Sequence, residues 1–416
     1  MSDGPERSPV ERALAVAGNL ARREQRRLAR RTRWAAKVAN EGMKDSLHAG
    51  RHAGESVRDG LVNTGKDLYR KVRRPLREAR RRRSQLQEQR RWFEIEWQVE
   101  KELETIVSRG RTLVVGPWLS EVGYEALYWV PFLRWVTAAF RIDPGRVVAV
   151  SRGGVASWYE GVASRYVEIW EHLDPADFAR RNAERGETKQ HTLSALDRDV
   201  LTAVTGTLGH DQYDVLHPSL MYRLFTLFWS GQRPMSFMDS HLRYARQAAP
   251  AIIDPALLPR DYVAVKFYSA RSLPDTPAIR SLLRHVVGAL SERMPVVLLD
   301  TGLVLDEHGD YELASGGRVV SARAWMTPQT NLGVQTQIIA GARAFVGTCG
   351  SIAWLAPRLG VDTSAVHVDP KWLHAHIALA LRAFHRLGAG EFAVADLRAI
   401  DPLGAVGSLR SERAEP

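Results

Sequence analysis

The sequence predicts an α/β protein with two Rossmann-like domains that face a cleft, preceded by a basic α-helical extension. Three observations carry this prediction. From residue 111 onward, short apolar strands alternate with glycine loops and helices. A second series of the same kind begins after residue 250. Finally, the excess positive charge is confined to the first quarter of the chain, where Arg, Ala, Glu and Leu favour helix.

The charge distribution separates the chain into two parts. The 416 residues carry a formal net charge of +11, with 58 Lys and Arg and 47 Asp and Glu. All of the excess lies in residues 1–110, which hold 27 basic and 16 acidic residues, while the remainder is balanced. The overall content of 45% hydrophobic and 25% charged residues is ordinary for a globular protein and excludes wholesale disorder, a collagen-like chain or a coiled-coil protein.

Residues 1–105 are the predicted basic helical extension. Apolar residues recur there about every 11 positions, on a narrow helix face, and residues 90–107 form a better amphipathic helix that contains Trp92 and Trp97. One interpretation is a solvated helix or coiled coil that tethers the protein to a partner. The other is attachment to an anionic membrane surface, worth roughly 1 kcal/mol for each nearby Lys or Arg. The pattern does not indicate nucleic acid as a partner, because no recognised binding motif appears.

The cysteine count and the apolar runs bear on the compartment. Cys349 is the single cysteine, which excludes an internal disulfide framework and fits a reducing compartment. No apolar run approaches the roughly 18–20 residues needed to span a bilayer, and the first 20 residues lack the pattern of a signal peptide. We therefore expect a cytoplasmic protein that lies peripherally on the inner face of the cell membrane.

Residues 106–250 are the first predicted Rossmann-like domain. Residues 111–118, 146–154 and 213–216 are predicted strands. Residues 119–140 are predicted to form a loop that leads into an apolar helix, and a further helix is predicted around residues 162–173. Residues 174–212 are polar with weak helical character, which is typical of an insertion or lid.

Two loops of this domain are candidate binding loops, because ligands sit at the carboxyl ends of parallel strands. In the first loop, Glu121 and Glu125 flank Gly123 and Tyr124, so that an acceptor hydroxyl could approach the backbone and lose its proton to a carboxylate. Alternatively, the two acids only occupy the first turn of a helix, where the helix dipole favours them.

The second loop contains Arg152 and Gly153, and here the arginine could bind an anionic or sugar substrate. An equally good interpretation is that Arg152 forms a surface salt bridge at the end of a strand. His217 follows a predicted strand and precedes Pro218, so it could face the cleft, although a histidine in such a place is more often structural.

Residues 251–400 are the second predicted Rossmann-like domain, and residues 401–416 are a predicted disordered tail. Predicted strands cover 261–270, 294–302, 316–322, 343–350 and, as the last strand, 363–369. Predicted helices cover 276–293, 335–342 and 351–360.

The most informative loop of this domain joins a buried strand to the predicted helix 351–360. It consists of Gly347, Thr348, Cys349, Gly350 and Ser351. Small side chains and free backbone N–H groups at a helix start suit a phosphate. The loop matches neither the Walker pattern nor G-x-G-x-x-G, so neither ATP nor a nicotinamide cofactor is indicated.

Two basic residues follow the first strand of this domain. Lys266 and Arg271 could neutralise a diphosphate, unless Lys266 merely extends its ammonium group from a strand end into water. Cys349 has no base that the sequence places nearby, so a role as a small loop residue is favoured over a nucleophile. No pattern of metal ligands is recognised.

Two segments carry a resemblance to a known family. The segments are VVGPWLSEVGYEALYWVPFL (114–133) and FVGTCGSIAWLAPRLGV (345–361). With them, residues 111–375 resemble GT-B glycosyltransferases, in particular the heptosyltransferase-like and fucosyltransferase-like groups that build bacterial surface polysaccharides. The first segment resembles the opening of the acceptor domain, and the second resembles the donor loop that holds the diphosphate of a nucleotide sugar.

The resemblance implies sugar transfer from a nucleotide diphosphate sugar, used as co-substrate, to a cell-envelope polysaccharide or glycolipid. It further implies an inverting, metal-independent reaction in which Glu121 or Glu125 deprotonates the acceptor. Many members use an aspartate in the first loop, where this chain has Glu121. Two alternatives stay open: a polysaccharide-modifying transferase of the pyruvyl transferase type, and a non-catalytic membrane-associated scaffold.

Overall fold

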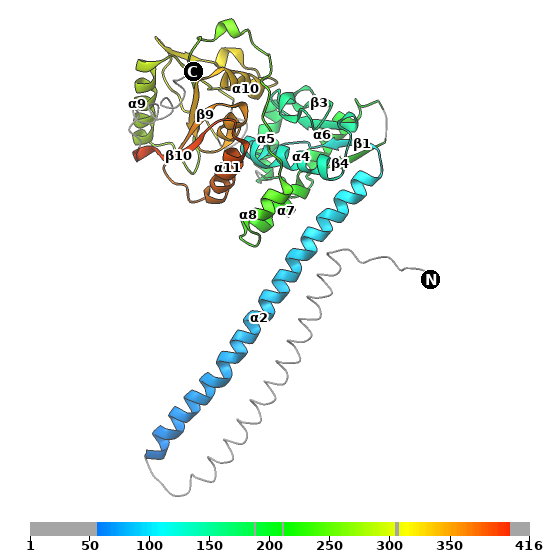
Figure 1. Ribbon diagram of the computed structural model, residues 1–416, viewed down its shortest axis with the longest axis vertical. Coiled ribbons are helices and arrows are strands. Elements are labelled where there is room, and N and C mark those ends of the chain that lie inside the picture. Colours follow the sequence, from blue (N-terminus) through cyan, green and yellow to red (C-terminus); the bar gives the residue numbers. More distant parts are fainter. Residues whose placement is uncertain (1–55, 187–188, 210–211, 304–307, 400–416) are drawn as a thin grey trace. The chain divides into compact units, whose positions relative to one another are not determined.

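Figure 1 shows a computed structural model, which describes residues 56–186, 189–209, 212–303 and 308–399. The chain divides into two compact units, residues 1–101 and residues 102–416. The predicted tail 401–416 and the part of the basic extension before residue 56 lie outside the described residues.

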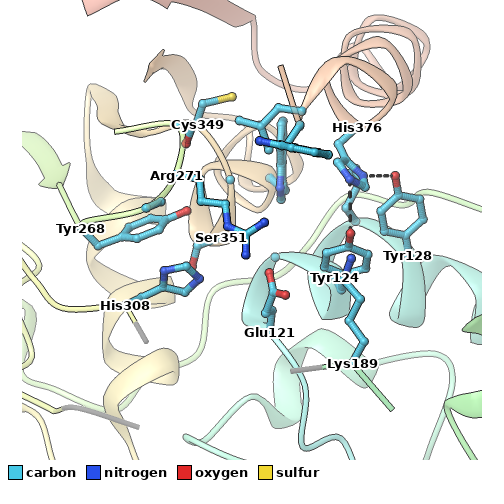
Figure 2. A pocket seen from close by; sticks show the side chains of 18 of the residues that line it. Glu121, Tyr124, Tyr128, Lys189, Tyr268, Arg271, His308, Cys349, Ser351 and His376 are labelled. Carbon is cyan, nitrogen blue, oxygen red and sulfur yellow. Dashed lines mark hydrogen bonds between the residues drawn. The ribbon is translucent and has the colours of Figure 1, made fainter. Parts of the chain in front are cut away.

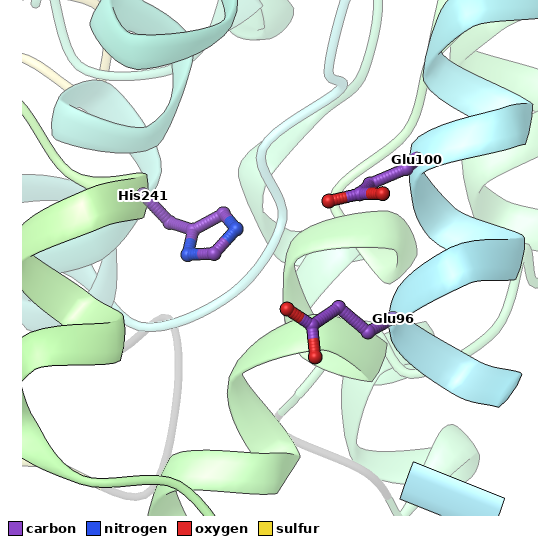
Figure 3. Close-up of side chains that lie close together, drawn as sticks. All are labelled: Glu96, Glu100 and His241. Atoms are coloured by element: carbon purple, nitrogen blue, oxygen red, sulfur yellow. The ribbon is translucent and has the colours of Figure 1, made fainter. Parts of the chain in front are cut away.

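The described part of the extension is a single helix, α2 (Ser56–Ser108). It continues through Pro75, although proline costs a helix interior about 3 kcal/mol. Arg90 and Glu94 form an ion pair of 3.0 Å one turn apart, and Glu96 and Glu100 extend their carboxylates from the same side of the helix (Figure 3). The side chains of residues 81–91 are all exposed, so the Arg81–Arg83 cluster faces solvent. Within the described chain, no helix is apolar over a length that would cross a membrane.

The first domain is built on a parallel four-stranded sheet with the strand order β3-β2-β1-β4. Its strands are β1 (Thr112–Val115), β2 (Val147–Ser151), β3 (Arg165–Glu168) and β4 (Tyr213–Leu216). The register places Leu113 of β1 beside Val147 of β2 and Asp214 of β4. The core on one side of this sheet packs Val148 and Val167 against apolar side chains of two helices, which include Phe178 and Val204.

The helices of this domain are α3 (Val122–Tyr124), α4 (Val130–Ala139), α5 (Pro175–Arg185), α6 (Ala195–Thr205), α7 (Ser219–Trp229) and α8 (Met235–His241). A π-helical turn, Glu125–Trp129, connects α3 to α4. Asp174 caps α5 by accepting hydrogen bonds from two backbone N–H groups, and Ser194 caps α6 in a reciprocal capping box with Asp197. These caps make two regular helices in the region that the sequence predicts as a weakly helical insertion.

The second domain has a parallel six-stranded sheet with the order β10-β9-β8-β5-β6-β7. Its strands are β5 (Val263–Lys266), β6 (Val296–Leu298), β7 (Val319–Ser321), β8 (Ala344–Thr348), β9 (Asp362–His367) and β10 (Phe392–Asp396). Its helices are α9 (Pro277–Arg293), α10 (Asn331–Gly341) and α11 (His374–Leu387). Numbered from its own first strand, this order is the 3-2-1-4-5-6 order of dinucleotide-binding Rossmann domains, read from the other edge.

Apart from the π-helical turn Glu125–Trp129, the short helical turns among the described residues of the body are of the 3₁₀ type. They are Pro144–Arg146, Ala156–Tyr159, Ile169–Glu171, Pro255–Leu257, Arg323–Trp325, Ser351–Trp354, Ala356–Leu359 and Leu397–Ala399.

The predicted fold class, an α/β protein with two Rossmann-like domains, is confirmed by these two parallel sheets. The predicted helix over 162–173 is wrong, because β3 lies there. Tyr166 and Val167 favour a strand, and β3 pairs in parallel with β2 at the edge of the sheet. The prediction that 363–369 is the last strand is also wrong, because β10 adds a further strand beside β9.

The predicted helix over 351–360 is wrong as well. Two 3₁₀ turns, Ser351–Trp354 and Ala356–Leu359, stand in its place. Pro357 lacks a backbone N–H and its ring clashes with an α-helical carbonyl, and Ser351 has a positive φ of 43°. The loop before this segment therefore does not lead into a full α-helix with its dipole.

A buried arginine joins the two domains. The guanidinium of Arg358 donates hydrogen bonds to the carbonyl oxygens of Ala126 (3.1 Å) and Ala245 (3.3 Å) and to Oε1 of Gln247 (3.0 Å). Burial lowers its pKa to about 9. Because Ala126 belongs to the π-helical turn after β1, this contact fixes the first loop of one domain against the second domain.

Candidate functional site

A cavity of about 520 Å³ opens between the two domains (Figure 2). The first domain contributes the segment after β1 and the segment between α5 and α6. The second domain contributes the loops after β5 and β8 and the start of α11. The main lining side chains are Glu121, Tyr124, Tyr128, Lys189, His191, Tyr268, Arg271, His308, Cys349, Ser351, Trp372 and His376. In both sheets the strand order reverses beside the first strand, and the crevice outside such a reversal is where ligands bind in this class of fold.

The loop after β1 is held in a single conformation and presents Glu121. Gly116 has a φ of 122°, and a Cβ there would clash with the carbonyl oxygen of Val150, so the position accommodates only glycine. Arg152 donates to the carbonyl oxygens of Trp118 (3.3 Å) and Ser120 (2.8 Å). With its loop fixed in this way, the Glu121 carboxylate extends into the cavity (Figure 2).

The second predicted carboxylate, Glu125, does not line the cavity. It is completely buried, and its Oε1 accepts hydrogen bonds from Ser151 Oγ (2.5 Å) and the Tyr159 hydroxyl (2.6 Å). Burial raises its pKa to about 7, although these two hydrogen bonds oppose the shift. Of the two predicted acids, the structure therefore brings only Glu121 to the cavity.

The loop with Arg152 and Gly153 is occupied by contacts within the protein. Glu168 accepts hydrogen bonds from the N–H groups of Gly153 (3.0 Å) and Gly154 (2.8 Å). The Gly153 carbonyl accepts from the N–H of Gly333 (2.9 Å) in the second domain. Arg152 is buried and lines a smaller adjoining cavity of about 120 Å³, not the main one.

Of the remaining residues predicted to bind the acceptor substrate, some line the main cavity and one does not. His217 is buried, with Nε2 3.4 Å from Asp197 and Nδ1 accepting from the N–H of Ser219 (3.2 Å), and it lines neither cavity. Gly123 and Tyr124 do line the main cavity. At Gly123 the domains come very close, because a Cβ there would lie 2.8 Å from the backbone nitrogen of Ser351.

In the predicted donor loop, the strand residues are structural and the turn faces the cavity. Thr348 Oγ1 accepts from the N–H of Tyr268 (3.0 Å) and donates to its carbonyl (3.1 Å), which ties the ends of β8 and β5 together. At Gly347, a Cβ would lie 2.6 Å from the Lys266 carbonyl oxygen. Gly350 and Ser351 line the cavity with positive φ angles of 127° and 43°. No acceptor among the described residues takes a hydrogen bond from the Gly350 N–H.

Cys349 lines the cavity but is almost completely buried, and its N–H donates to the Val366 carbonyl (2.8 Å). Burial raises the pKa of its thiol to about 12. Because the thiolate is the nucleophilic form, this environment does not suit a reactive cysteine.

The two predicted donor cations lie in different surroundings. Lys266 is buried, and its Nζ lies 2.6 Å from Asp310 and 2.8 Å from the Leu299 carbonyl oxygen. It lines only the smaller cavity, and its charge is already balanced by Asp310. Arg271 is exposed and points into the main cavity (Figure 2).

Two residues of the site carried no signal in the sequence. Lys189 comes from the polar segment between α5 and α6, and its Nζ lies 4.6 Å from the centre of the Tyr124 ring. Burial, and then the nearby Arg271 charge, lower its pKa, although Glu121 acts in the opposite direction.

His376 lies on α11, with Nδ1 2.5 Å from the Tyr128 hydroxyl and Nε2 3.2 Å from that of Tyr124. Burial and the Lys189 charge lower its pKa to about 4, so His376 is neutral at physiological pH.

The charges of the main cavity favour an anionic ligand. Lys189 and Arg271 approach it from opposite domains, and Glu121 is the acid that faces them (Figure 2). Two cations next to one carboxylate leave an excess of positive charge, which attracts anions and raises their local concentration. Trp372, 62% exposed, adds an aromatic face to the cavity wall.

Comparisons with known proteins give only distant likenesses. No protein-family model and no curated protein match the chain. It is similar to the E. coli heptosyltransferase WaaC with ADP, at 14% identity and a TM-score of 0.36 over 72% of this chain and 98% of that one. WaaC with ADP-2-deoxy-2-fluoro heptose gives 15% identity and a TM-score of 0.31 over the same shares. A putative UDP-N-acetylglucosamine 2-epimerase from Listeria monocytogenes gives 10% identity and a TM-score of 0.31 over 72% of this chain and 88% of that one.

Proposed function

We propose that the protein is a glycosyltransferase that moves a sugar from a nucleotide diphosphate sugar to a hydroxyl of a polysaccharide or glycolipid. One observation carries this proposal. A single cavity, at the strand-order reversals of two Rossmann-like sheets, places the Glu121 carboxylate of one domain opposite Arg271 and the Gly350 backbone of the other. A base and an anion-binding wall on opposite sides of a cleft are what transfer from a diphosphate leaving group requires.

In the proposed reaction, Glu121 accepts the proton of the acceptor hydroxyl while the hydroxyl oxygen attacks the anomeric carbon of the donor sugar. The bond between that carbon and the diphosphate oxygen breaks, and its electron pair leaves with the nucleoside diphosphate. Arg271 and Lys189 stabilise the charge that develops on the leaving group. One displacement inverts the anomeric centre. Because these two cations serve the diphosphate, the reaction is proposed to proceed without a metal ion.

Glu121 is preferred to Glu125 as the base for a geometric reason. A general base must come within hydrogen-bond reach of the proton that it removes. Glu121 lines both cavities, whereas Glu125 lines neither and already accepts two hydrogen bonds inside the first domain.

The basic extension is proposed to hold the enzyme at an anionic membrane surface, where a cell-envelope acceptor would be found. The support is the exposed Arg81–Arg83 cluster on α2. Near such a surface each arginine contributes roughly 1 kcal/mol. Attachment to a partner protein is the competing explanation, and the vesicle experiment in the Discussion distinguishes the two.

A ligand screen tests the proposed reaction class. UDP-glucose, ADP-glucose and GDP-mannose are compared with phosphoenolpyruvate by thermal shift at millimolar concentration. We expect at least one nucleotide sugar to raise the melting temperature and Arg271→Gln to weaken its binding about tenfold or more. The matched control is Arg280→Gln, because Arg280 pairs with Asp275 and lines neither cavity. Stabilisation by phosphoenolpyruvate alone would favour a pyruvyl transferase instead.

A further inference from the structure

The smaller cavity of about 120 Å³ has no role in the reaction proposed so far. It shares Glu121, Tyr268 and Ser351 with the main cavity, so the two meet at the proposed base. Its volume is well above the roughly 10–15 Å³ that one water requires. Asn331 and Gln335 of α10 line this cavity but not the main one, and they are 5% and 2% exposed.

The hydrogen bonds of these two amides determine which of their atoms remain for a ligand. The Asn331 side-chain nitrogen donates to the Pro328 carbonyl (2.7 Å), and the Gln335 side-chain nitrogen donates to the Asn331 carbonyl (3.2 Å). Reversing either amide would turn its oxygen towards a carbonyl oxygen, so the orientation is fixed. In the described part of the chain, no donor reaches Asn331 Oδ1 or Gln335 Oε1.

Two amide oxygens that are open to the cavity and have no protein donor indicate the chemistry of a ligand that would cover them. A ligand that covers such an amide oxygen removes its hydrogen bond to water, which costs about 1–3 kcal/mol unless the ligand donates a hydrogen bond in its place. A hydroxyl group can donate, whereas a phosphate or carboxylate oxygen cannot. These side chains therefore favour a ligand that carries hydroxyl groups and disfavour an anion.

The charges of the smaller cavity agree with this conclusion. Lys266 is neutralised by Asp310, with which it forms an ion pair of 2.6 Å. The remaining charges, Arg152 and Glu121, are of opposite sign. The main cavity has an excess of positive charge, and the smaller cavity has none.

We infer that the smaller cavity binds the transferred group itself, and that this group is an uncharged sugar whose ring hydroxyls donate to Gln335 Oε1 and Asn331 Oδ1. The inference rests on the proposed function and extends it to the class of donor sugar. The diphosphate then lies in the cationic main cavity, and the anomeric carbon lies at the junction beside Glu121.

The test separates the sugar from the nucleotide. Dissociation constants are measured by titration calorimetry for UDP, ADP and GDP and for UDP-glucose, ADP-glucose and GDP-mannose, using the full-length protein. Gln335→Met is compared with wild type, and Gln337→Met is the matched control. Gln337 lies on the same helix but bonds to the backbone of Ile252 and Ile253, and it lines neither cavity.

We expect Gln335→Met to weaken the best-bound nucleotide sugar by about 3- to 10-fold, the usual effect of one neutral hydrogen bond. Its affinity for the matching nucleoside diphosphate should stay within about twofold of wild type. For Gln337→Met, the ratio of the two affinities should not change, even if the variant is less stable.

Three results have different consequences. Equal losses for nucleotide and nucleotide sugar, or no loss for either, would overturn the assignment of the smaller cavity while leaving the proposed function intact. The absence of binding by all six compounds would overturn the proposed function and the inference with it. If Gln335→Met does not fold, donor analogues that lack single ring hydroxyls are titrated against wild type. At least one should bind about 3- to 10-fold more weakly, and uniform affinities would refute the inference.

Discussion

The closest approach of the two proposed binding loops can be tested by adding one methyl group. Gly123, in the loop that carries Glu121, has a backbone conformation that alanine can adopt, so Gly123→Ala introduces no backbone strain. Its Cβ, however, would lie 2.8 Å from the backbone nitrogen and 3.1 Å from the Cα of Ser351 in the other domain. Because both atoms are backbone, no side chain can rotate away to relieve the contact.

The size of the effect follows from these distances. An ordinary contact begins at about 3.4 Å, so the two loops must separate by about 0.6 Å. Inserting a methylene-sized group into a packed region typically costs 1–3 kcal/mol, and we expect this loss in the free energy of unfolding. Displacing a base or a phosphate-binding turn by about 1 Å can cost about 10²-fold in rate. A shift of 0.6 Å should therefore lower kcat/KM for sugar transfer by about tenfold.

Urea unfolding measures the first effect, and the rate of sugar transfer from a nucleotide sugar measures the second. The matched control is Gly288→Ala on the exposed face of α9, where an added Cβ meets no atom within 4 Å. The free energy of unfolding of this control should rise by about 0.5–1 kcal/mol, because alanine favours a helix more than glycine does. If Gly123→Ala were as stable as wild type and transferred sugar with the same kcat/KM, the close contact between the two loops would be refuted.

Three further predictions concern buried groups and the basic extension. Because its pKa is raised to about 7, Glu125 holds its proton more tightly in the native state than in the unfolded state. As pH rises from about 4.5 to 7, the free energy of unfolding of wild type should therefore fall by up to about 3 kcal/mol relative to that of Glu125→Gln. A pH-independent difference between the two proteins in urea unfolding would contradict this. The Cys349 thiol should resist alkylation in the native protein, and Cys349→Ala should retain transfer activity; loss of turnover in a folded variant would instead support a nucleophile. The full-length protein should sediment with vesicles that contain anionic lipid, and replacing Arg81–Arg83 by glutamine should weaken this binding about tenfold or more; indifference to lipid charge would favour a protein partner.

Much of the fold could be predicted from the sequence, because buried parallel strands that end in glycine are locally recognisable. Strands β1 and β8, which contain Leu113 and Phe345, are of this kind. Where local preference is weak, the pairing of strands decides instead. Tyr166 and Val167 fit either a helix or a strand, and only the free edge of β2 selects the strand. Likewise, the residues after 350 match a helical pattern, but Pro357 restricts them to 3₁₀ turns.

The site was only partly predictable, because a charged residue at a strand end does not reveal its partner. Lys266 and Arg271 look equivalent in the sequence, yet Asp310 neutralises the first while the second faces the main cavity. Lys189 and His376 belong to no motif and come from opposite domains. Only the closing of the domains against each other brings them to one cavity, and the sequence alone contains no sign of that arrangement.

The most direct test of the central claim measures two properties of Glu121→Gln: its rate of sugar transfer and its affinity for the nucleotide sugar. Glutamine keeps the size of the side chain but cannot accept the acceptor proton, and general base catalysis typically contributes 10²–10⁴-fold. We predict that turnover falls by about 10²-fold or more while the affinity for the nucleotide sugar stays within a few-fold of wild type. Turnover near the wild-type rate would contradict the account, because it would place the base elsewhere.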